Sequence, residues 1–62
     1  MDSAIYTEAM LGSFARKVAE LDKANVYWQA SFAKGIAGET VVKLEWRADQ
    51  MMAYYDSLEA RL

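Results

Sequence analysis

The chain has 62 residues, of which 55% are hydrophobic, and nine acidic against seven basic residues give a formal net charge of −2. A chain of this length forms one small domain over residues 1–62 and buries only about 60% of the surface that its unfolded form exposes. It contains no cysteine and no histidine, which excludes a disulfide and, in practice, a structural zinc site. We therefore expect its stability to depend on association with a second copy or with a protein partner.

The acidic balance offers no bulk attraction to nucleic acid or to an anionic membrane surface. The longest stretch without a charged residue runs only from Ala24 to Ala33, whereas a membrane-spanning helix needs roughly 20 apolar residues. The N-terminus carries Asp2 and no basic segment before an apolar core, so no secretory signal is visible. These observations favour a cytoplasmic protein that has no membrane partner.

Apolar residues recur at alternating steps of three and four, which is the spacing of one face of an α-helix. The first series is Leu11, Phe14, Val18, Leu21, Asn25, Trp28 and Phe32. The second series is Val41, Leu44, Ala48, Met51, Tyr55, Leu58 and Leu62. The pattern predicts an all-α antiparallel helical hairpin with helices over about 3–34 and 39–62, a turn over 35–38, and dimerisation into a four-helix bundle.

Residues at the ends of the two segments agree with this coiled-coil interpretation. Ser3 is a good N-cap, and Lys34 followed by Gly35 is a good helix stop. Asn25 is the one polar residue in the well-formed part of the first seam. A buried asparagine at such a position sets the register and oligomeric state of a coiled coil, and the alternative is that Asn25 marks a helix boundary.

The core of the helical hairpin should consist of the larger apolar side chains of the two seams. These are Leu11, Phe14, Val18, Leu21, Trp28, Phe32, Leu44, Met51, Tyr55 and Leu58.

The middle of the chain also fits a second pattern, in which apolar residues alternate with period two. Val26, Trp28, Ala30 and Phe32 form one such run, and Val42, Leu44 and Trp46 form another. This alternation predicts an α+β helix–β-hairpin–helix fold with strands over about 26–32 and 40–46. The connection has no Asn-Gly or Asp-Gly turn, which favours the helical hairpin.

The sequence offers little for catalysis or ligand binding. Without histidine and cysteine, the commonest general base and the strongest nucleophile are missing. The carboxylates of Glu45 and Asp49 stand beside Lys43 and Arg47, as on an ordinary solvated face. We predict no enzyme activity, no catalytic, cofactor-binding or metal-binding residue, and no small-molecule substrate.

An aromatic and apolar surplus lies off the predicted seams, and residues of these types are enriched at protein interfaces. The predicted interface residues are Trp46, Met52, Tyr54, Tyr27, Val26 and Val42. They indicate a small non-enzymatic interaction module, which would act as an adaptor, co-chaperone or inhibitor of a protein partner, as a homodimer, or as both. We expect Trp46 to contact another chain, because it faces away from the helical seam.

A weaker candidate is a nucleic-acid contact through Arg16, Lys17 and Lys23, which Glu20 and Asp22 interrupt. In length, in its two heptad-bearing segments and in its short turn, the chain resembles the plasmid RNA regulators of the Rop type. That resemblance implies an RNA-binding regulator as the alternative function, although no motif carries over and the acidic balance opposes it.

Two further resemblances concern size and layout only. The helical hairpin is similar to co-chaperones of type III secretion needle subunits and to phage-encoded accessory proteins. The helix–β-hairpin–helix alternative resembles the phage head–tail joining proteins of the W type, which implies a role in virion assembly. Such likeness does not by itself establish function.

Overall fold

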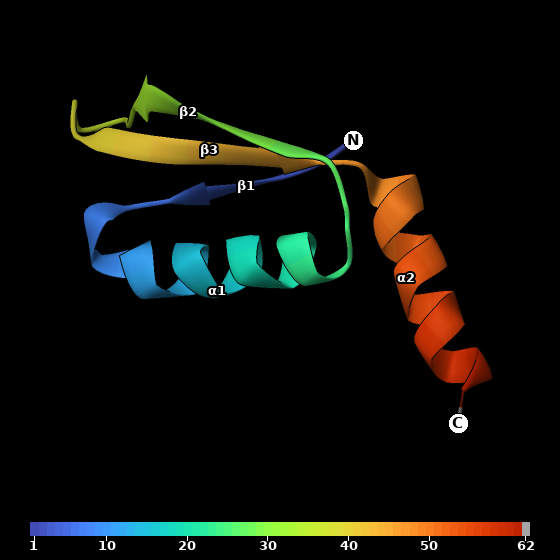
Figure 1. Ribbon diagram of the computed structural model, residues 1–62. Coiled ribbons are helices and arrows are strands. Elements are labelled where there is room, and N and C mark those ends of the chain that lie inside the picture. The colour runs from blue at the N-terminus through green and yellow to red at the C-terminus, as the bar shows by residue number, and fades with distance from the viewer. Residues whose placement is uncertain (62) are drawn as a thin grey trace.

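The computed structural model describes residues 1–61 and shows an α+β fold (Figure 1). Its elements are strand β1 (Asp2–Tyr6), the 3-10 turn η1 (Glu8–Met10), helix α1 (Leu11–Lys23), strands β2 (Trp28–Lys34) and β3 (Thr40–Trp46), and helix α2 (Ala48–Ala60). The prediction of an all-α helical hairpin, with its coiled coil and four-helix bundle, is therefore wrong. Leu62, the last predicted seam position, lies outside the described residues.

The three strands form one antiparallel sheet in the order β1-β3-β2, with β3 in the centre. Helix α1 lies along one face of this sheet, and α2 leaves the end of β3 and projects away from it (Figure 1). Pairing with β3 places Ala4 and Ala30 on either side of Leu44. Within residues 1–61, only β3 has a neighbouring strand on both sides, so β1 and β2 are the two edges of the sheet.

The β-hairpin of the alternative prediction is close to the observed one. Its second strand, 40–46, coincides with β3, whereas its first strand, 26–32, begins two residues before β2. The alternative did not include β1 at all. Ser3, which was expected to cap a helix, instead lies in β1 opposite Glu45.

Helix α1 ends at Lys23 because Asn25 adopts a left-handed backbone conformation with φ of 56°. The N–H of Val26 donates to the carbonyl of Leu21 at 2.9 Å, and the N–H of Asn25 donates to that of Asp22 at 3.1 Å. These two bonds make a Schellman motif, which is usually accompanied by an apolar contact across the helix end. Both Leu21 and Val26 belong to the buried core. Asn25 is exposed and marks a helix boundary, so it does not set a coiled-coil register.

The β2–β3 connection uses glycine where the predicted helix turn was placed. The N–H of Gly38 donates to the carbonyl of Gly35 at 3.0 Å, and Gly38 has φ of +83°. Glycine occupies that left-handed region without a steric penalty. Residues 35–38, which the sequence predicts as a turn between two helices, therefore connect the two strands of a β-hairpin.

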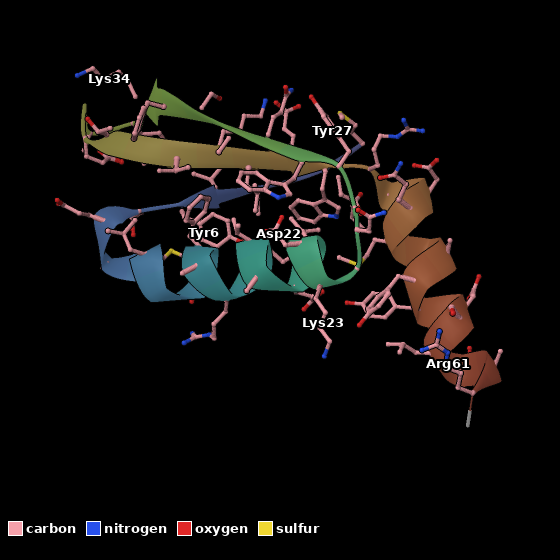
Figure 2. The ribbon with its side chains drawn as sticks, in the orientation of Figure 1. Tyr6, Asp22, Lys23, Tyr27, Lys34 and Arg61 are labelled. Carbon is pink, nitrogen blue, oxygen red and sulfur yellow. The ribbon has the colours of Figure 1, made fainter. Side chains whose placement is uncertain are left out.

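The core lies between the sheet and α1, with the first turns of α2 closing one end. Leu21 and Leu44 are fully buried at 0% exposure. The other buried residues of this cluster are Tyr6, Val26, Trp46 and Met51, and Ala4, Phe14, Val18, Ala24, Trp28 and Tyr54 pack against it. Tyr6 points into the space between the sheet and α1 (Figure 2) and stacks edge-on against Phe14, with ring centroids 5.5 Å apart.

The expected core is partly correct. Leu21, Leu44 and Met51 are buried, and Phe14, Val18 and Trp28 are half-buried. Four expected core residues are exposed: Leu11, Phe32, Tyr55 and Leu58. Neither helix in the described part of the chain is long and apolar enough to cross a membrane.

We expect Leu44→Ala to lower the free energy of unfolding by about 2–5 kcal/mol, because it opens a cavity beneath α1 at a fully buried site. The matched control is Ile36→Ala in the exposed hairpin turn, which should change it by no more than about 0.5 kcal/mol. Urea denaturation followed by circular dichroism measures both. Equal effects of the two substitutions would contradict the observed core.

We expect Asn25→Val to destabilise the protein by about 1–2 kcal/mol, since a β-branched residue resists the left-handed conformation. Asn25→Gly should be neutral or slightly stabilising, because glycine is the preferred residue at this position. Thermal denaturation of the two variants separates these effects. A valine variant as stable as the wild type would rule out the helix-ending role.

Candidate protein-interaction surface

The structure places the six residues that the sequence suggested as an interface in different environments. Val26 and Trp46 are buried in the core, which leaves little of their surface for a partner. Val42 and Tyr54 are half-buried. Tyr27 and Met52 are exposed, the first just before β2 and the second on α2. Only Tyr27 and Met52 of the six are therefore exposed.

Trp46 lies on the α1 side of the sheet, opposite Trp28 in the neighbouring strand. The Nζ atom of Lys17 sits 4.7 Å from the centroid of a Trp46 ring, a cation–π contact within one chain. Lys17 is therefore directed toward the sheet, whereas Arg16 and Lys23 are exposed on the opposite side of α1. The three basic residues proposed as a nucleic-acid contact do not form a common patch.

Strand β2 presents an unusually open edge. All of its residues except Trp28 are exposed, and it carries no charge before Lys34. Proteins commonly protect edge strands with charged residues, proline, bulges or short length. β2 is seven residues long, contains no proline and pairs with β3 in an unbroken register. Apart from Lys34 at its end, β2 therefore lacks these protections.

The hydrogen bonds at the two ends of the hairpin show which backbone groups of β2 face outward. The N–H of Gly35 donates to the carbonyl of Glu39 at 2.7 Å, and the N–H of Arg47 donates to that of Tyr27 at 3.1 Å. Bonded and non-bonded pairs alternate along an antiparallel ladder. The N–H and C=O groups of Ala30 and Phe32 thus point away from β3, toward the free edge.

A hollow of about 810 Å³ lies beside this edge, between the sheet and the start of α1. Apolar walls come from both edge strands, β3 and α1, and Glu8 and Glu39 add two carboxylates. The full lining is Tyr6, Thr7, Glu8, Ala9, Leu11, Phe32, Gly38, Glu39, Thr40 and Val42. Phe32 stands at this hollow with 82% of its surface exposed. No basic residue lines it, so the hollow combines apolar walls with negative charge.

The sequence analysis predicts Phe32 as a core residue, because the spacing of Phe32 from its apolar neighbours fits both a helical seam and a buried strand face. A signal was nevertheless present. Between Lys23 and Lys34 no charge protects a run that was recognised as a candidate strand, and an uncharged strand at a sheet edge is a site for pairing. Whether the strand is central or at an edge depends on the strand order, which the sequence did not reveal.

Helix α2 is fixed to the rest of the protein through its first two turns. Met51 is buried, and the side-chain oxygen of Gln50 accepts the N–H of Tyr27 at 2.7 Å. One turn later the hydroxyl of Tyr55 donates to Oε1 of Glu20 on α1 at 2.7 Å. This bond lowers the pKa of Glu20, with the nearby Lys17 adding to the effect, and it raises the pKa of Tyr55.

Among residues 1–61, no three side chains of aspartate and glutamate gather as a metal-binding group. Comparison of the chain with family models, with curated proteins and with solved structures gives no match.

We expect Tyr55→Phe to lower stability by no more than about 1 kcal/mol, because the lost hydrogen bond is solvent-accessible. The loss should depend on pH. The Glu20 carboxylate has a lowered pKa, so the bond contributes fully above the ordinary value of 4.5 and is lost as the pH falls through the lower folded value. Tyr55 has a raised pKa, so the contribution is present below 10.0 and is lost as the pH rises through the higher folded value.

Melting temperatures of the wild type and the Tyr55→Phe variant, measured between pH 3 and 8, test this expectation. The two curves should converge at acidic pH, and Glu20→Gln should reduce the difference at neutral pH. A difference that does not vary with pH would contradict the proposed role of the bond.

Proposed function

We propose that the protein is a small protein-binding module that accepts an extended segment of a partner as an additional strand along β2. The observation that carries this proposal is the solvent-exposed edge of β2, which has no charged residue before Lys34 and carries the exposed ring of Phe32. Strand addition is a common mode of peptide recognition, in which backbone hydrogen bonds give affinity and alternate side chains give specificity.

The backbone of β2 supplies the first part of this recognition. The outward N–H and C=O groups of Ala30 and Phe32 are spaced as an incoming antiparallel or parallel strand requires. The backbone N–H and C=O groups of the odd-numbered residues of β2 already bond to β3, and those of the even-numbered residues are free. Adding a strand would therefore require no rearrangement of the sheet.

The hollow beside Phe32 supports a preference for particular side chains. Alternate residues of an added strand would lie on the α1 side of the sheet, which is the side of Phe32 and of the hollow. An apolar side chain there would cover Phe32, whose exposed ring now faces water. The carboxylates of Glu8 and Glu39 favour a lysine or arginine beside it. The expected partner segment is therefore extended, alternately apolar, and basic.

Selection from a displayed library of short random peptides tests this function. We expect enrichment of peptides that combine alternating apolar residues with lysine or arginine. Phe32→Ala should weaken binding of the enriched peptides by about ten-fold or more, since a single well-packed aromatic residue often contributes this much. Ile36→Ala, which alters another exposed apolar residue of the same hairpin, is the matched control and should have little effect.

Backbone methylation of an enriched peptide separates strand addition from other modes of binding. Methyl groups on one alternate set of peptide nitrogens should abolish binding, whereas methyl groups on the other set should leave it largely intact. If both methylated peptides bind equally, or if Phe32→Ala binds as the wild type does, the function is not strand addition at β2.

A further inference from the structure

The fold leaves the outer face of α1 uncovered. The opposite side of this helix carries Phe14, Val18 and Leu21 into the core. The outer face consists of exposed residues, most of them small: Gly12, Ala15, Arg16, Ala19 and Lys23. Lys23 projects from α1 away from the sheet in Figure 2.

This outer face of α1 is positively charged because the other charged residues of the helix are engaged elsewhere. Lys17 lies against Trp46, and Glu20 accepts the hydroxyl of Tyr55. Asp22 accepts the indole N–H of Trp28 at 2.8 Å, which holds its carboxylate toward β2. Arg16 and Lys23 remain as two exposed cations, one heptad apart.

Helix α2 also has an uncovered face, and its charge is opposite. Met51 and Tyr54 turn toward the core. The outer face consists of exposed residues: Asp49, Met52, Ala53, Asp56, Glu59 and Ala60. Within residues 1–61 the ion pairs are Lys17–Glu20 and Arg47–Asp49, so Asp56 and Glu59 have no ion-pair partner in the described part of the chain.

The two faces are opposite in charge and similar in spacing. Arg16 and Lys23 are seven residues apart, and so are Asp49 and Asp56, although Asp49 already pairs with Arg47 of its own chain. Seven residues make two helical turns, a separation of about 10.5 Å on each helix. Alanine residues between the charges allow two helix axes to approach closely. Met52, at 62% exposure, would then be covered by the alanines of α1.

The two faces cannot meet within one chain. Tyr55 of α2 bonds to Glu20 of α1 on a side of α2 other than its acidic outer face, and α2 projects away from the sheet and α1 (Figure 1). We propose that the acidic outer face of α2 docks on the basic outer face of α1 of a second copy. Each copy offers one face of each kind, and such a head-to-tail contact repeats into a ring or a filament.

Two double variants with reversed charges test this contact by sedimentation velocity over a range of protein concentrations. R16E/K23E makes both outer faces acidic, and D56K/E59K makes both basic. Each variant alone should associate about ten-fold more weakly than the wild type or worse, because like charges then face each other. An equimolar mixture should regain association, since every contact in it again joins opposite charges.

The control variant is K34E/K43E, which changes the net charge as much as R16E/K23E does but on the sheet. It should associate as the wild type does, and rising salt should weaken association of the wild type. Circular dichroism establishes that each variant is folded, and the quadruple variant R16E/K23E/D56K/E59K should associate on its own.

Three outcomes would overturn the proposal. The wild type could remain monomeric at millimolar concentration, the mixture could associate no better than its components, or association could survive both double variants. Binding of peptides at β2 is measured separately with Phe32→Ala, so failure of one proposal does not decide the other.

Discussion

The fold depends on β3 having a strand on each side. Pairing with β1 and β2 brings residues 2–6 beside residues 40–46, and the row Ala4, Leu44 and Ala30 crosses the sheet beneath α1. The two alanines are small, so α1 can approach until Leu21 and Leu44 are both fully buried. Because β1 pairs with a strand about forty residues away, closing that loop costs entropy that this core must offset.

The small size of the chain explains why so much of its surface remains exposed to solvent. One helix covers one face of a three-stranded sheet, and α2 contributes only its first turns to the core. The edge of β2, the hollow beside Phe32 and the outer faces of both helices therefore remain exposed. Small domains bury a low fraction of their surface, and here the exposed remainder has distinct chemistry: an uncharged strand edge, an acidic hollow and two helix faces of opposite charge.

The middle of the chain shows why a spacing pattern can mislead. Trp28 and Phe32 are four residues apart, which satisfies both a helical seam and a strand face. Asn25 also fits two interpretations, a buried coiled-coil position and a helix boundary. Its left-handed backbone conformation ends α1 and excludes the coiled-coil position. Once the helix ends, residues 28–34 are extended, and β3 pairs with them. Trp46 then turns into the core, although a helical reading directs it outward.

The sequence by itself determined the absence of cysteine and histidine, the acidic balance and the apolar surplus. The helices that it predicted over about 3–34 and 39–62 are helical only over 11–23 and 48–60. It placed Leu21, Leu44 and Met51 inside, and it indicated a hairpin as an alternative. Only the tertiary structure decided that β1 exists, since Asp2, Ser3 and Ala4 have weak strand preference and pair with a distant segment. It also decided which strands are edges, because strand order depends on long-range pairing and β2 lacks the run of charges or proline that commonly marks an edge strand.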